Sequence, residues 1–100
     1  MARRRTATLT AANQFTGNIS LKRGGIVTLS GTFTGNVSLQ RYDDTSAAWV
    51  DVTSNAGTPV VYTVIGTYGV DPYGFAAQYR VGYKAGATPT GSCVASIEGK

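Results

Sequence analysis

The sequence predicts an all-β protein, a single antiparallel β-sandwich of the jelly-roll or Ig-like kind with about seven or eight strands. Three observations predict this fold. Apolar and polar residues alternate with a period of two along most of the chain, no stretch longer than a few residues has a helical period, and turn-forming segments recur every ~8 to 12 residues. Short strands at this spacing are typical of a sandwich or small barrel rather than a flat sheet.

The first half of the chain contains three alternating segments, near residues 18–22, 27–33 and 37–39. In the first of them Ile19 and Leu21 point to one face and Ser20 to the other, so the two apolar residues are expected in the core. The same alternation assigns Val27, Leu29, Phe33, Val37 and Leu39 to the core. A turn is predicted at Asp43 to Ser46, because Asp side chains bond nearby backbone N–H groups.

The second half begins with a strand near residues 49–52 and a turn over 55–59. The mostly apolar run 60–65 is predicted to be a strand buried on both faces, and the glycine-rich segment 66–74 to be a long loop. The clearest strand follows at 77–84, and Cys93, Ala95 and Ile97 are expected to face inward from the last strand.

Two nearly identical segments occur in the first half, QFTGNISLKR at 14–23 and TFTGNVSLQR at 32–41. In each, Phe-Thr-Gly-Asn precedes an apolar alternation, so each copy is predicted to begin a strand at equivalent places of a meander, with the Gly permitting a bulge or turn. A coincidence of common strand and turn residues is the alternative. Two copies are too few for a solenoid or propeller.

Positive charge is concentrated at the N-terminus. The net charge is +4, and without Arg3, Arg4 and Arg5 six basic residues face five acidic ones, leaving +1. We therefore predict a flexible basic arm over residues 1–5 and a single nearly neutral sandwich domain over 6–100. The chain shows no apolar membrane span or secretory leader, and its single cysteine fits a reducing compartment, so we expect cytoplasmic synthesis and no membrane partner.

The residue inventory disfavours catalysis, metals and cofactors. The chain has no histidine, which removes the usual zinc sites and the Ser-His-Asp arrangement, and Cys93 lacks an imidazole partner. The carboxylates are few, and Asp43 and Asp44 fit a turn better than a catalytic pair. We predict no enzyme activity, no catalytic residue, no cofactor and no metal. A nearly neutral body also disfavours nucleic acid as a partner, although the arm alone could contact phosphates.

Partner contacts are expected at the basic arm and at the tyrosines of the glycine-rich loop. The candidate residues are Arg3, Arg4, Arg5, Tyr68, Asp71 and Tyr73. Exposed rings suit a protein contact or a carbohydrate site, but packing within the loop is an equally open role for these tyrosines. Trp49 is out of phase with Val50 and Val52, and we expect it to close one end of the sandwich.

Three segments carry a family resemblance: IVTLSGTFTGNVSLQRYDDTSAAWVDV at 26–52, QYRVGYKAG at 78–86 and GSCVASIEG at 91–99. They resemble a pattern in small all-β virion structural proteins of tailed bacteriophages. The shared pattern is an apolar strand, S-G-T-F-T-G, a V-x-L-Q-R strand, an acidic turn and W-V-D-V, followed by a Y-R strand and a final strand. The resemblance carries over no catalytic residue.

The resemblance implies a non-enzymatic virion protein, made in the host cytoplasm, most simply a capsid decoration or cement protein. Its expected partners are the major capsid protein or other virion proteins, and a homo-oligomer stays open. A phage neck or tail accessory protein is the first alternative. A carbohydrate-binding β-sandwich module that uses Tyr68, Tyr73 and Trp49 is the second. A low charged fraction of 14% fits any of these, because uncharged polar surface is easier to bury in a contact.

Overall fold

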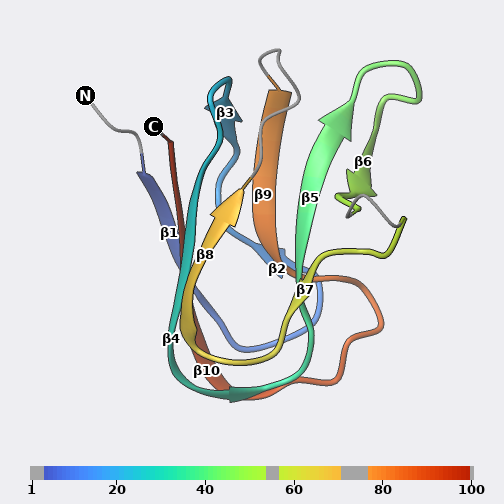
Figure 1. Cartoon of the computed structure of the whole chain (residues 1–100). Helices are drawn as coiled ribbons and strands as arrows, with labels where there is room; N and C mark the ends of the chain where they lie inside the picture. The colour runs from blue at the N-terminus through green and yellow to red at the C-terminus, as the bar shows by residue number, and fades with distance from the viewer. Residues whose placement is uncertain (1–3, 54–56, 71–76, 100) are drawn as a thin grey trace.

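The structure, a computed structural model, describes residues 4–53, 57–70 and 77–99. Its strands form two antiparallel sheets that pack against each other as two layers (Figure 1). No helix occurs among these residues. The all-β sandwich that the alternation predicts is therefore confirmed.

The sheet that we call sheet A contains four strands, in the order β1 (Arg4–Leu9), β10 (Thr90–Gly99), β4 (Gly25–Thr34) and β8 (Gly66–Val70). The second sheet, sheet B, is built on β9 (Ala77–Tyr83) and β5 (Val37–Asp43), which lie side by side. The strands β2 (Gln14–Phe15) and β3 (Ile19–Leu21) pair with β9, while β6 (Ala48–Asp51) and β7 (Val61–Tyr62) pair with β5.

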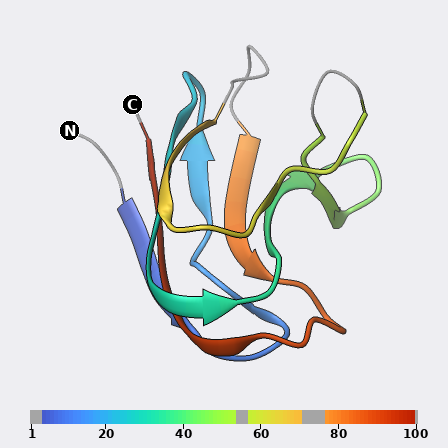
Figure 2. The same cartoon turned by 60° about the horizontal axis from the view of Figure 1, so that its bottom comes forward.

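The chain passes repeatedly from one sheet to the other (Figure 2). It leaves sheet A after β1, returns for β4, and crosses again before β5, β8, β9 and β10. The described residues contain ten strands, more than the seven or eight predicted, because several are short pieces of two or three residues. Repeated crossing means that most strand pairs form between segments distant in the sequence.

The core lies between the two sheets and is formed by the inward residues of both. Its buried apolar members are Leu9, Ile19, Leu21, Val27, Leu29, Val37, Leu39, Val52, Tyr62, Val70, Tyr79, Val81, Tyr83, Cys93, Ala95 and Ile97. The alternation therefore assigned the core correctly along β3, β5 and β10, while Phe33 is only partly buried against the core. Each inward side chain of this size contributes about 1.5–3 kcal/mol by leaving water.

The predicted basic arm is too long by at least two residues. Arg4 and Arg5 belong to β1, where they pair with Glu98 and Ile97 of β10. The reason is that the open side of β10 offers a row of backbone hydrogen-bonding groups, and the first residues of the chain satisfy them. Arg3 lies outside the described residues.

The expectations for residues 60–74 are wrong over their described part. Val64 and Ile65 are 63% and 56% exposed, so the run 60–65 is not buried on both faces. Residues 66–70 form β8 rather than a loop, because they pair with residues 25–29 of β4. Two residues of the run form the short strand β7, and residues 63–65 connect sheet B to sheet A; only Tyr62 in the run is buried.

Close approach of β2 to β9 requires glycine at position 82. A Cβ atom added there would collide with the carbonyl oxygen of Gln14 and lie 2.6 Å from the Cα atom of Phe15. Gly82 pairs directly with Phe15 in the ladder between the two strands. Its missing side chain therefore allows β2 to join the edge of sheet B.

We expect Gly82→Ala to lower the free energy of unfolding by about 1–3 kcal/mol, because the backbone of β2 must move away. Urea denaturation followed by circular dichroism measures this change. Gly69→Ala is the matched control, since a Cβ atom at that position in β8 meets no atom within 4 Å. Equal denaturation midpoints for the two variants would contradict this account of the β2–β9 contact.

Candidate functional site

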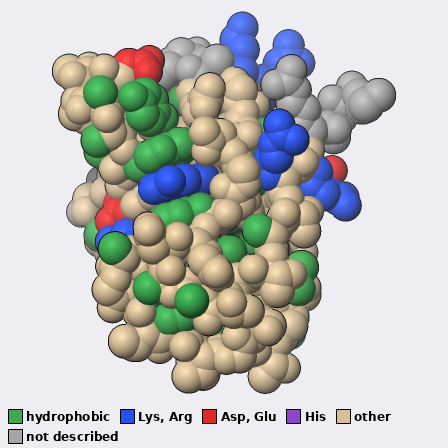
Figure 3. Space-filling view, turned by 180° about the vertical axis from the view of Figure 1, so that it is seen from behind, with side chains coloured by type: hydrophobic (Ala, Val, Ile, Leu, Met, Phe, Trp, Pro, Cys, Tyr) green, Lys and Arg blue, Asp and Glu red, His purple; other side chains and the backbone are tan. Residues whose placement is uncertain are grey.

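The outer face of sheet B carries the most elaborate side-chain arrangement among the described residues. Along β9 the odd-numbered Tyr79, Val81 and Tyr83 enter the core, so Gln78 and Arg80 point outward. Figure 3, which shows the molecule from behind, has hydrophobic side chains on either side of a basic one on this face. Acidic and further basic side chains lie close by.

Arg80 lies between two aromatic rings. Its guanidinium carbon is 3.8 Å from the ring centre of Phe15 and 4.4 Å from that of Trp49. A guanidinium group can stack on both rings because it is planar and weakly hydrated. Arg80 therefore joins β2 to β6 across the outer face of the sheet.

A polar network continues from Arg80 across the sheet. Both Nε and Nη2 of Arg80 donate hydrogen bonds to Oε1 of Gln40, at 3.0 and 2.9 Å. Nε2 of Gln40 donates to Oδ1 of Asp51 at 3.1 Å, and Nζ of Lys84 lies 2.8 Å from Oδ2 of that carboxylate. The hydrogen bond from Lys84 is the main cause that holds the pKa of Asp51 below its usual value. Gln40 is buried, so the network satisfies its amide on both sides.

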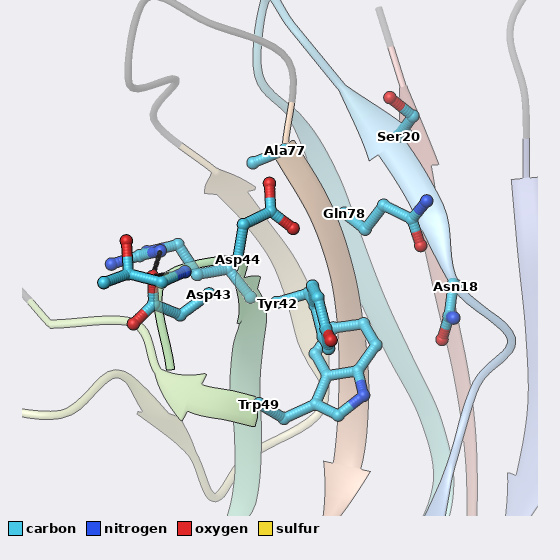
Figure 4. A pocket seen from close by; sticks show the side chains of 10 residues that line it. Asn18, Ser20, Tyr42, Asp43, Asp44, Trp49, Ala77 and Gln78 are labelled. Carbon is cyan, nitrogen blue, oxygen red and sulfur yellow. Dashed lines mark hydrogen bonds and ion pairs between the residues drawn. The ribbon is translucent and has the colours of Figure 1, made fainter. Parts of the chain in front are cut away.

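A cleft of about 710 Å³ opens on this face next to Trp49. Its lining residues are Asn18, Ser20, Arg41, Tyr42, Asp43, Asp44, Thr45, Trp49, Ala77 and Gln78. Figure 4 shows the rings of Tyr42 and Trp49 lying together on one side, with Gln78, Asn18 and Ser20 along the other. The cleft thus has an aromatic wall from β5 and β6 and a polar wall from β9, β3 and the residue before β3.

The aromatic wall is fixed by contacts on several sides. The ring centres of Tyr42 and Trp49 are 5.5 Å apart at an interplanar angle of 72°, an edge-to-face contact. Tyr42 and Trp49 are also direct partners in the β5–β6 ladder. With Arg80 on one ring of this pair, Trp49 is held in place before any ligand arrives.

The acidic turn beyond β5 forms the rim of the cleft. Asp43 accepts hydrogen bonds from the backbone N–H of Thr45 and the hydroxyl of Ser46, at 3.3 and 2.8 Å. The bond from Ser46 is the main cause that holds the pKa of the Asp43 carboxyl below its usual value. Arg41 lies 4.0 Å from the same carboxylate. This turn was predicted from the sequence, and Asp44 in it points toward Ala77 across the cleft (Figure 4).

The predicted contact residues that the structure describes do not form one site. Arg4 lies 3.5 Å from Glu98 at the exposed edge of sheet A, and Nε of Arg5 donates to the backbone carbonyl of Asn18 at 3.1 Å. Tyr68 stacks on Tyr62, with ring centres 4.4 Å apart, and its hydroxyl donates to the carbonyl of Val64. Of the six candidates, Arg3, Asp71 and Tyr73 lie outside the described residues. Of the three described candidates, only Arg5 supports the cleft, through the backbone next to its polar wall.

Trp49 does not close an end of the sandwich, as the sequence suggested; it lies half-buried on the outer face of sheet B. Trp49 and Asp51 face outward because they pair with Tyr42 and Gln40 of β5, while Val52 is buried in the core. Sequence reasoning also missed Tyr42, Asn18 and Gln78. The signal was available in part, since Gln78 and Tyr42 are out of phase with the core residues of their strands.

Catalytic and metal chemistry have no visible centre in the part of the chain that is described. No group of three His, Cys, Asp or Glu side chains gathers there in a way that would hold a metal ion. Cys93 is buried in β10, and burial raises the pKa of its thiol, which disfavours the nucleophilic thiolate. Over residues 4–53, 57–70 and 77–99 there is also no helix long and apolar enough to cross a membrane.

Comparison with known proteins yields no relative: no protein-family model, no curated protein and no solved structure matches this chain.

Removing the Arg80 side chain should loosen the aromatic wall. Arg80→Ala takes away two ring contacts and leaves Oε1 of the buried Gln40 without its donor, so we expect a loss of about 1–3 kcal/mol in unfolding free energy. Trp49 is the single tryptophan of the chain, so its fluorescence emission should move to longer wavelength. Arg23→Ala, at an exposed arginine before β4, is the control. Unchanged emission in Arg80→Ala would show that the stacking does not hold Trp49.

Tyr62 should make the protein sensitive to alkaline pH. Its hydroxyl is buried and has no hydrogen-bond partner among the described residues, and burial raises its pKa to about 12. An unfolded tyrosine has a pKa of about 10, so the folded state holds the proton more tightly. Stability from this source is complete below about pH 10 and is lost as the pH rises toward 12, by on the order of 2 kcal/mol.

Urea denaturation between pH 7 and pH 11.5 measures this loss as the difference between the wild-type protein and Tyr62→Phe. We expect Tyr62→Phe to be as stable as the wild type at pH 7 and more stable at pH 11.5. Tyr42→Phe, which removes a hydroxyl on the outer face of sheet B, controls for the change of residue type. Parallel pH curves for wild type and Tyr62→Phe would refute the assignment.

Proposed function

We propose that this chain is a non-enzymatic structural protein of a virus particle, a capsid decoration or cement protein that binds the shell through protein–protein contacts. The resemblance of residues 26–52, 78–86 and 91–99 to small virion proteins of tailed bacteriophages supports the choice of partner. A place at the neck or tail of the particle is the alternative within this class. The protein would act by adding contacts between shell subunits, and this needs no catalytic group.

The observation that carries the proposal is a set of exposed apolar side chains in β7 and in the segment 63–65 that joins β7 to β8. Val61 of β7 is 41% exposed, and Val64 and Ile65 of the joining segment are 63% and 56% exposed. Only 14% of the residues of the chain are charged, so the surface of the protein as a whole carries few charges. Apolar side chains on a surface with few charges are typical of the central part of a protein–protein interface.

Tyr68 fixes this segment through two contacts, one from its ring and one from its hydroxyl. Its ring stacks on the buried Tyr62, and its hydroxyl bonds to the carbonyl of Val64, one residue before Ile65. A segment that is already ordered loses less conformational entropy when it binds. The predicted role of Tyr68 in partner contact therefore becomes an indirect one, because it positions Val64 and Ile65 for the partner.

Mass spectrometry of density-gradient-purified particles from the source culture tests the function, with copy number measured relative to the major capsid protein. Hundreds of copies per particle would support decoration of the shell. A dozen or fewer would move the protein to the neck, tail or vertices. Absence from the particles would overturn the virion proposal.

The contact segment itself is tested by the double variant Val64→Ser and Ile65→Ser. If these side chains are buried against the shell, attachment to particles should weaken at least tenfold, since burying each contributes about 1.5–3 kcal/mol. Sedimentation of purified variant with particles that lack the protein measures this. Val94→Ser is the matched control, because Val94 is an exposed valine on the outer face of sheet A. A loss in Val94→Ser alone would place the contact on sheet A instead.

A further inference from the structure

We infer that the cleft on the outer face of sheet B is a carbohydrate-binding site. A saccharide would pack one ring face against the wall of Tyr42 and Trp49 and exchange hydrogen bonds with Asn18, Gln78 and Asp44. The site is separate from the segment that joins β7 to β8, because its walls come from β3, β9, β5 and β6. The inference therefore does not rest on the proposed virion function.

The size of the cleft suits a small ligand. Its volume of about 710 Å³ falls within the ~300–1,000 Å³ of typical small-molecule sites. It lies on the outer face of sheet B and is not enclosed by the protein, so a longer glycan chain can extend beyond it. The face of a β-sheet is also where OB-folds, another all-β class, bind oligosaccharides.

The aromatic wall supplies the apolar half of sugar recognition. The C–H groups on one face of a sugar ring form an apolar surface that packs on an aromatic ring, and rigid rings do this at low entropic cost. Trp49 is already fixed by Arg80 at 4.4 Å and by the edge of Tyr42 at 5.5 Å. The wall is therefore formed in the absence of ligand.

The polar wall supplies the hydrogen-bonding groups for sugar recognition. The side-chain amides of Asn18 and Gln78 each offer an acceptor oxygen and two donor hydrogens, and the carboxylate of Asp44 accepts. Sugar hydroxyls are donors and acceptors at once, so they pair with such a mixed set without leaving groups unsatisfied. The backbone beside this wall is tied down, because the carbonyl of Asn18 accepts the hydrogen bond from Arg5.

The charges of the cleft favour a neutral ligand over a phosphate. Arg41 is the one basic residue among the described lining residues, and it already faces the carboxylate of Asp43 at 4.0 Å. Asp44 adds a second negative charge at the rim. A nucleic acid or phosphorylated ligand would meet these two carboxylates without a free cation to offset them.

Binding of the full chain to an array of defined glycans, followed by ¹⁵N NMR titration with chitotriose, cellotriose, maltotriose and the best array ligand, tests the inference. We expect at least one glycan to bind and to shift the side-chain amide signals of Asn18 and Gln78 and the indole N–H of Trp49. No array binding and no shifts with any of these sugars would overturn the site. Shifts confined to residues outside the cleft would overturn it as well.

Variants separate the cleft from the rest of the surface. Gln78→Ala and Tyr42→Ala should each weaken glycan binding at least tenfold, and Gln78 is exposed, so its loss should leave the fold intact. Thr28→Ala, an exposed residue on the outer face of sheet A, is the control and should bind as the wild type does. Equal binding by all three variants would overturn the assignment, as would a peptide library ligand that occupies the cleft where no glycan does.

Discussion

The two sheets share one apolar layer, and this constraint decides the direction of almost every other side chain. A chain of 100 residues has material for one core only, so each strand must give the same face to it along its length. The centre of sheet A shows the result, because Cys93, Ala95 and Ile97 of β10 are fully buried. A shift of one residue in the β10 register would send these three side chains to solvent. The outward side chains of both sheets are not needed for this core, so they can serve in hydrogen bonding or in binding.

The outward side chains of the two sheets differ in size and in hydrogen bonding. In the middle of β4 they are Thr28, Ser30 and Thr32, small groups that remain exposed. On sheet B the outward residues are large or hydrogen-bonded, and Gln40 is buried among Arg80 and Asp51. Within this network the partly exposed ion pair of Lys84 and Asp51 contributes only about 0–1 kcal/mol. The hydrogen bonds of the buried Gln40 fix Arg80, and Arg80 in turn fixes the position of Trp49.

Local patterns predicted the strands, and pairing between distant segments limited that prediction. Alternation gave the core residues of β3, β5 and β10, because the side-chain period of a strand is local information. It failed for residues 66–70, where two glycines and a tyrosine suggested a loop, since the partner strand β4 lies about 40 residues earlier. The prediction of a five-residue arm failed for the same reason, because Arg4 and Arg5 pair with β10 at the other end of the chain. Residues from four strands line the cleft, so no local sequence pattern could predict it.

Each of the two Phe-Thr-Gly-Asn copies leads into a strand that helps to line the cleft. Each copy begins a strand of sheet B, and the resulting β3 and β5 both run antiparallel to β9, one on each side of it. They are displaced, however, because Ser20 of the first copy pairs with Gln78 while the equivalent Ser38 pairs with Gly82, four residues further along.

That displacement of roughly 13 Å, at ~3.3 Å per residue, brings different parts of the two repeats to the same level. Asn18 and Ser20 of the first copy lie opposite Tyr42, which follows the end of the second copy and pairs with Trp49. The predicted meander is not present, since the strand between the copies, β4, belongs to sheet A. Duplication of one strand-beginning sequence thus produces an asymmetric cleft, polar where the first copy begins its strand and aromatic where the second copy ends.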